Sequence, residues 1–135
     1  MKYIDSTVIV YALGYGDDPR SHRARFLLEE MVKGKYIGIS SNLLISEVSW
    51  ALWKLKGKDY ALEQVNKLLS FSSMRFIPVS DRVVVRSLEL MKKYSSLRPF
   101  DALHAATCIE NGADTLISDD SDFDKISEIK RERLD

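Results

Sequence analysis

Short apolar runs alternate along the chain with longer segments in which apolar residues recur every three or four positions. The short runs are KYI at 2–4, YIGIS at 36–40, RFIPV at 75–79, TLIS at 115–118 and IKRERL at 129–134. Their length and their β-branched and aromatic content predict five strands. The last run is polar enough to lie at the edge of a sheet, and Pro78 is tolerable at the end of the third.

The longer segments carry the periodicity of amphipathic helices. They predict helices over residues 8–16, 21–34, 43–57, 59–69, 80–94 and 100–112. Pro19 and Pro99 suit first helical turns, while Gly34, Gly57 and Gly112 suit helix ends. Strands that alternate with helices indicate parallel β-α-β units. We therefore expect an α/β fold, a three-layer α/β/α sandwich around a mostly parallel sheet of roughly five strands.

Composition narrows the class of protein without identifying it. The 135 residues suit one domain, which we place over residues 1–135. The 20 basic and 20 acidic residues cancel, so a nucleic acid would have to be attracted by a local patch. The single cysteine, Cys108, cannot form an internal disulfide, which favours a reducing cytoplasm. No run approaches the ~18 apolar residues that a membrane span needs, so no membrane partner is expected.

Acidic residues gather where predicted strands end. Asp5 follows the first strand, and Asp119, Asp120 and Asp122 follow the run at 115–118. The carboxyl ends of parallel strands meet at one edge of a sheet, where ligands bind. Carboxylates more than a hundred residues apart in sequence are therefore expected to be neighbours in space.

Two helical acids belong with this group. Asp101 lies in the first turn of its predicted helix, and it shares this edge of the sheet if the helix leads back into the strand at 115–118. Glu47 has only apolar neighbours three and four positions away, namely Leu43, Leu44, Trp50 and Ala51. Its carboxylate is expected to point along the packed face, and the alternative is an edge glutamate that extends outward to water.

Carboxylates brought this close need a counter-charge. Two like charges ~4 Å apart repel by ~1 kcal/mol in water and by ~4 kcal/mol at an effective dielectric constant near 20. Oxygen ligands without nearby cysteine or paired histidine favour Mg²⁺, with Mn²⁺ as a substitute. A calcium loop of the EF-hand type is excluded, because its glycine position is Lys125 and its final glutamate position is Arg131.

Three segments resemble the PIN domain family, and within it the VapC-type toxins of toxin–antitoxin pairs. They are YIDSTVIVYAL, ISEV and RPFDALHAATCIENGADTLISDDSDFDKI, which together run nearly end to end. The resemblance implies a Mg²⁺-dependent endoribonuclease that cleaves RNA by a metal-activated water. The implied catalytic residues are Asp5, Glu47, Asp101, Asp120 and Asp122, and the implied metal ligands are Asp5, Asp101 and Asp120.

The resemblance also assigns supporting roles. It places Ser118 in the position whose hydroxyl orients the first aspartate, with Ser6 as a second supporting residue. It aligns Asp120 rather than Asp119 with the ligand position, although Asp119 departs from the basic or neutral residue common there. The number of metal ions, one or two, stays open.

RNA and protein partners follow from the same resemblance. Candidate phosphate contacts are Arg98, Lys54 and His104, although His104 is better explained by pairing with a carboxylate or the backbone. The aromatic residues Trp50, Trp53, Tyr60 and Phe71 exceed what a small core needs. We expect some of them to form a homodimer face or an antitoxin groove.

Other functions remain as alternatives. A solitary RNA-processing nuclease would carry the same acids as a toxin, and a non-catalytic RNA- or protein-binding module would have lost some of them. A phosphohydrolase of the haloacid dehalogenase type needs Asp-x-Asp after the first strand, where this chain has Asp5, Ser6 and Thr7.

Overall fold

The central sheet has five strands, all parallel. The computed structural model describes residues 1–135. The strands are β1 (Lys2–Ile4), β2 (Gly38–Ser41), β3 (Met74–Ile77), β4 (Thr115–Ile117) and β5 (Lys130–Glu132). Their order across the sheet is β3-β2-β1-β4-β5, and every neighbouring pair is parallel. The predicted α/β class and strand number are confirmed, and β5 is the polar edge.

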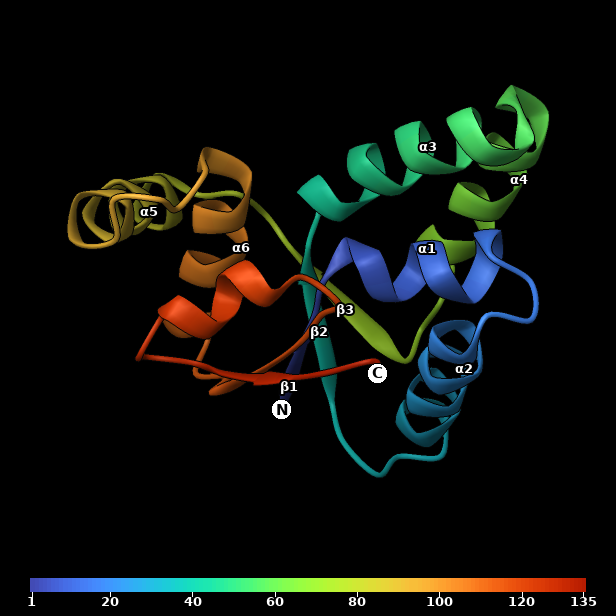
Figure 1. Cartoon of the computed structure of the whole chain (residues 1–135), viewed down its shortest axis with the longest axis horizontal. Helices are drawn as coiled ribbons and strands as arrows, with labels where there is room; N and C mark the ends of the chain where they lie inside the picture. The colour runs from blue at the N-terminus through green and yellow to red at the C-terminus, as the bar shows by residue number, and fades with distance from the viewer.

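Helices cover both faces of the sheet. They are α1 (Ser6–Gly14), α2 (Pro19–Val32), α3 (Leu43–Lys56), α4 (Lys58–Leu69), α5 (Asp81–Lys93) and α6 (Pro99–Glu110). Figure 1 shows α5 and α6 on one side of the strands and α1 to α4 on the other. A short 3₁₀ helix, η1 (Ser121–Lys125), follows β4 and was not predicted. None of the helices combines the length and apolarity that crossing a bilayer requires.

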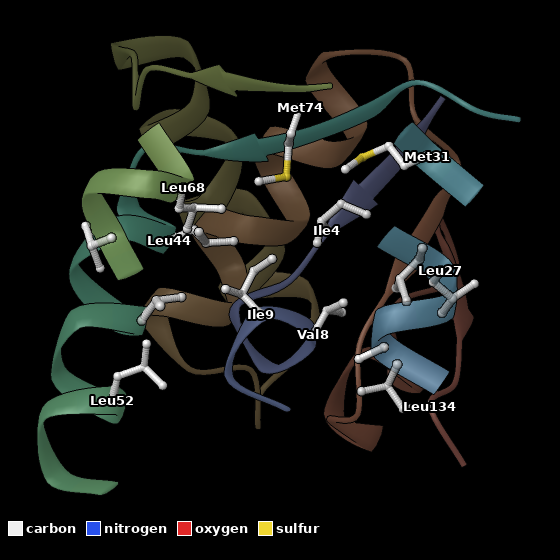
Figure 2. Close-up of a cluster of buried hydrophobic side chains, with 14 of the residues drawn as sticks. Ile4, Val8, Ile9, Leu27, Met31, Leu44, Leu52, Leu68, Met74 and Leu134 are labelled. Atoms are coloured by element: carbon white, nitrogen blue, oxygen red, sulfur yellow. The ribbon is translucent and has the colours of Figure 1, made fainter. Parts of the chain in front are cut away.

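The alternation of side chains along each strand divides the apolar residues into two cores. Ile4 packs in a core with Val8 and Leu44 on the side of α1 to α4 (Figure 2). Ile117 belongs to the same core. The preceding residues, Tyr3 and Leu116, belong to the second core beneath α5 and α6. Because strand residues alternate between faces, a sheet buried on both sides requires this continuous apolar run.

The central strand pair positions the acidic residues. β1 pairs with β4 in a register that sets Ile4 beside Ile117, and Asp5 N–H donates to the carbonyl of Ile117 at 3.0 Å. Asp5 therefore leaves the sheet beside Ser118, the residue that follows Ile117. Asp5 is also the N-cap of α1, so the end of the strand and the start of the helix both fix its backbone.

Candidate metal centre

Three carboxylates form a cluster at the carboxyl edge of the sheet. One oxygen from each of Asp101, Asp120 and Asp122 lies within 4.8 Å of the other two. Asp101 comes from the first turn of α6, Asp120 is the N-cap of η1, and Asp122 lies in its first turn. Opposite ligands of Mg²⁺ are about 4 Å apart in an octahedral shell. The spacing and the all-oxygen donor set therefore fit one hard divalent cation.

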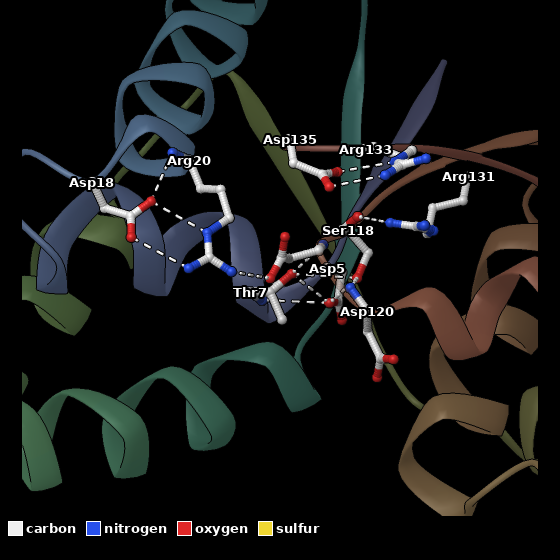
Figure 3. A network of polar contacts seen from close by, with 10 residues as sticks. Asp5, Thr7, Asp18, Arg20, Ser118, Asp120, Arg131, Arg133 and Asp135 are labelled. Atoms are coloured by element: carbon white, nitrogen blue, oxygen red, sulfur yellow. Dashed lines mark hydrogen bonds and ion pairs between the residues drawn. The ribbon is translucent and has the colours of Figure 1, made fainter.

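Asp5 lies beside this cluster but outside the set of three. It is 4 % exposed, and its Oδ2 accepts hydrogen bonds from Ser118 Oγ at 2.6 Å and Thr7 Oγ1 at 2.9 Å. Figure 3 shows these contacts, with Asp120 next to them. No hydrogen bond engages Oδ1, which lies 4.0 Å from His104 Nε2 and could serve as a ligand atom.

Burial and crowding make the charged form of Asp101 unfavourable. Burial, followed by the charges of Asp120 and Asp5, raises the pKa of Asp101 from 3.8 to about 6. His104 opposes this shift, since its positive charge lowers the same pKa. A cation bound by the cluster would relieve both the burial penalty and the repulsion.

Metal binding is expected to weaken as the pH falls through about 6, because protons compete for Asp101. Between about pH 4 and pH 6, Asp101 still holds its proton in the metal-free folded protein but has lost it in the unfolded chain. The stability of the metal-free protein therefore decreases as the pH rises through this range. A bound cation reverses that loss. The rise in Tm on adding Mg²⁺ should be larger near pH 7.5 than near pH 5, which thermal denaturation measures. A Tm rise that is the same at both pH values would contradict this.

Thr7 is a residue that the sequence analysis missed. Its hydroxyl bonds to Asp5 Oδ2, lies 3.3 Å from Ser118 Oγ, and accepts the N–H of Asp119 at 3.0 Å. The side chain of Ser6, which was expected to support the site, makes no hydrogen bond. A signal was available, because an N-cap side chain reaches the second or third residue of its helix, and Thr7 is two residues after Asp5.

The substitution Ser118→Ala is expected to reduce metal affinity and cleavage by about 10- to 100-fold, the usual cost of losing a group that orients a ligand. The hydroxyl donates to Asp5 Oδ2 and accepts the N–H of Asp120 at 3.0 Å, so it joins the two acids. Isothermal titration with Mn²⁺ measures the change. Ser87→Ala is the matched control, because that buried hydroxyl bonds only within α5. Equal effects from both variants would rule out an orienting role.

A buried hydrogen-bond chain holds Glu47. His104 is 0 % exposed, its Nε2 bonds to Glu47 Oε1, and its Nδ1 lies 2.5 Å from the hydroxyl of Tyr3. That hydroxyl also accepts the N–H of Ser41 at 3.0 Å. Because His104 has no exposed surface, it is not positioned to contact an RNA phosphate. It pairs with a carboxylate instead, as the sequence analysis preferred.

The chain from Tyr3 to Glu47 also affects the charge of His104. Burial lowers the pKa of His104, but the hydrogen bond to Glu47 and the charge of Asp5 outweigh it, so the pKa is raised overall. A carboxylate can only accept, so Nε2 donates to Glu47. Tyr3 is a further residue that sequence reasoning missed, since an aromatic residue in a short strand gives no sign of a polar role.

The remaining aspartates of the run at 119–124 are occupied elsewhere. Asp119 Oδ2 accepts from Arg20 Nη1 at 3.2 Å, and Asp124 receives two hydrogen bonds from Arg131 at 2.8 and 3.0 Å. The candidate phosphate contacts Arg98 and Lys54 are both exposed. Each is therefore accessible to a ligand, unlike His104.

The aromatic residues of α3 are exposed and do not pack in the core. Trp50 is 58 % and Trp53 43 % exposed, and Lys54 Nζ lies 5.3 Å from the Trp50 ring. Tyr60 donates its hydroxyl to the carbonyl of Leu13. The two tryptophans therefore leave apolar surface uncovered on the outer side of α3.

Comparison with known families identifies a match over most of the chain. A model of the PIN domain family matches residues 2–129. A search of curated protein sequences gives no match.

Solved structures share the fold over nearly their whole length. VapC20 from Mycobacterium tuberculosis, described as a sarcin-ricin loop cleaving toxin, gives a TM-score of 0.79 at 16% identity, covering 94% of this chain and 95% of that chain. VapBC2 from Rickettsia felis, bound to a promoter DNA fragment, gives 0.79 at 21% identity, with 100% of both chains covered. FitAcB from Neisseria gonorrhoeae gives 0.74 at 15% identity, covering 99% of this chain and 98% of that chain. At these identities the likeness establishes the fold.

Proposed function

This chain belongs to the PIN domain family, and from that premise we propose that it is a Mg²⁺-dependent endoribonuclease, the toxin of a toxin–antitoxin pair. The observation that carries the proposal is the convergence of Asp101, Asp120 and Asp122 within 4.8 Å of one another. A family member that had become a non-catalytic binding module would have no reason to keep these mutually repelling acids. Their cost to the folded state is visible in the raised pKa of Asp101.

The residues of the site would have different roles in phosphodiester hydrolysis. Mg²⁺, or Mn²⁺ in its place, would supply a water of lowered pKa when bound and would neutralise charge on the phosphate. Asp101, Asp120 and Asp122 would hold the cation, with Asp5 Oδ1 as a further ligand. Ser118 and Thr7 fix the orientation of Asp5.

Glu47 would act at the rim of the same site. Its side chain is 27% exposed, and His104 holds one of its oxygens, leaving the other free to accept a hydrogen bond from water or substrate. Arg98 would contact an RNA phosphate from its position as the N-cap of α6, and Lys54 would do so from α3. These contacts would supply the local positive charge that the neutral chain lacks overall.

Protein partners are part of the proposal. Matches to VapBC2, a toxin–antitoxin complex from Klebsiella pneumoniae and FitAcB support a cognate antitoxin. Exposed Trp50 and Trp53 support a homodimer or antitoxin contact, because lone proteins rarely expose large apolar patches. RNA and antitoxin would both be met in the cytoplasm.

A cleavage assay tests the proposal. The purified protein is incubated with a mixed RNA pool in Mg²⁺ and in EDTA, beside Asp120→Asn prepared in the same way to detect contaminating nuclease. We expect discrete products only for the unaltered protein in Mg²⁺. Equal products in EDTA, or from the variant, would contradict a metal-dependent nuclease.

A further inference from the structure

The carboxylate cluster borders a hollow of which the proposed chemistry uses only Glu47 and Thr7. A cavity of about 280 Å³ is bounded by α1, α3 and the segment after β4, and its lining includes Thr7, Tyr11, Tyr15, Glu47 and Asp119. Thr7 links the cavity to the site, because its hydroxyl bonds to Asp5 and accepts the N–H of Asp119. An occupant of this cavity therefore lies directly beside the proposed metal ligands.

One wall of the cavity is a pair of neighbouring aromatic rings. The rings of Tyr11 and Tyr15 have centroids 4.7 Å apart and planes inclined by 31°. The guanidinium of Arg20 lies 4.6 Å from the Tyr11 ring centre, which holds that ring in place. Tyr15 remains 45 % exposed. It offers a flat apolar surface of the kind on which nucleobases stack in single-stranded RNA sites.

Two acidic side chains on the other wall, Asp119 and Glu47, determine which kind of ligand the cavity can bind. Asp119 and Glu47 would repel a phosphate. Each carboxylate already has a partner inside the protein, Arg20 for Asp119 and His104 for Glu47. A metal ion in this cavity would therefore gain less binding free energy from them than from unpaired carboxylates. Asp119 also interacts with the Tyr11 side chain, while Glu47 Oε2 accepts no hydrogen bond. A neutral planar group that carries an N–H donor can bond to these carboxylates while it packs on the aromatic wall.

We propose that this cavity binds a nucleobase of the RNA next to the scissile phosphate, stacked on Tyr15 and donating an exocyclic amino hydrogen to Asp119 or Glu47. The inference rests on the proposed ribonuclease function and names a determinant of its specificity. Adenine, cytosine and guanine carry such an amino group, whereas the base of uridine has only its ring N3–H as a donor. Cleavage should therefore disfavour uracil at this one position.

The surface beyond Tyr15 supports the same path for the RNA. Tyr15 and Ala51 also line a second hollow of about 220 Å³, which includes Lys54. An RNA strand that stacks one base on Tyr15 would bring its next phosphate toward the Lys54 side chain. The order along the surface is thus carboxylate cluster, aromatic wall, then positive charge.

The test compares Tyr15→Ala with Tyr15→Phe, which keeps the ring. Short RNAs that differ in the base on either side of one cleavage site give KM and kcat for each variant. Loss of stacking should raise KM roughly 5- to 150-fold with kcat largely kept, and Tyr15→Phe should restore the unaltered value. Asp119→Asn should weaken the discrimination against uracil.

A binding measurement gives a readout that does not need cleavage. In an Asp101→Asn background, an RNA with a fluorescent adenine analogue at this position should be quenched on binding, and adding Tyr15→Ala should abolish the quenching. If the protein cleaves RNA but Tyr15→Ala keeps its KM, base preference and quenching, the base site is refuted, and a partner protein becomes the candidate occupant. If the unaltered protein cleaves no RNA in Mg²⁺, the proposed function itself fails.

Discussion

Replacing Asp101 by asparagine is expected to abolish RNA cleavage and, at the same time, to make the metal-free protein more stable above about pH 6. A metal ion contributes several kcal/mol to such a reaction, so losing it should reduce the rate by about 10³-fold or more. The stability effect follows from the raised pKa of Asp101, which burial and the neighbouring Asp120 and Asp5 produce. A neutral asparagine avoids that penalty where the aspartate is charged.

Asp124→Asn is the matched control for charge. This carboxylate is exposed and bonded to Arg131, and that hydrogen bond lowers its pKa. Its charged form therefore favours the folded state, so its removal should lower stability slightly and leave cleavage intact. Cleavage rates and Tm values in EDTA, measured for both variants, separate the two cases. Retained cleavage by Asp101→Asn, or a lower Tm for it in EDTA, would count against the scheme.

Phe123→Ala is expected to give the largest loss of stability among substitutions near the site, about 3–5 kcal/mol. Phe123 is 0 % exposed and belongs to the core beneath α5 and α6. It lies between Asp122 and Asp124 in η1 and anchors that turn to the core. A loss of this size should lower Tm by roughly 10–20 °C, and displacement of Asp122 should weaken Mn²⁺ binding.

Leu88→Ala is the control for this substitution, because Leu88 is 58 % exposed on α5 and its removal should change stability by only about 0.5 kcal/mol. Urea unfolding gives the stability of both variants, and titration below the melting range gives their affinity for Mn²⁺. If Phe123→Ala were as stable as the unaltered protein, the η1 turn would not depend on its core anchor.

Much of the fold could be predicted because local signals agreed with the tertiary arrangement. The strand runs are continuous and apolar since β1 and β4 are buried on both faces, and Pro19 and Pro99 begin α2 and α6 as expected. The helix η1 could not be predicted in the same way. Its SDFDK sequence lacks helical periodicity, and what forms the turn is the burial of Phe123 together with the N-cap hydrogen bond of Asp120.

The site was predictable to the extent that sheet topology controls it. Asp5 and Asp120 both follow parallel strands, so their proximity follows from strand order alone. The roles of Tyr3 and Arg20 depend on hydrogen bonds across the fold, and no spacing in the sequence encodes these. The separation of Asp119 from Asp120 is one example, since Asp119 bonds to Arg20 and Thr7 instead of joining the cluster. The contact of Thr7 with Asp5 follows instead from the spacing of an N-cap and its helix.

The most direct measurement is an anomalous difference map from crystals soaked in Mn²⁺. The account predicts a peak between the carboxylates of Asp101, Asp120 and Asp122, within reach of Asp5, that disappears in Asp101→Asn. A map with no peak there at a saturating Mn²⁺ concentration, or a peak held by other residues, would contradict the claim that these acids share a cation.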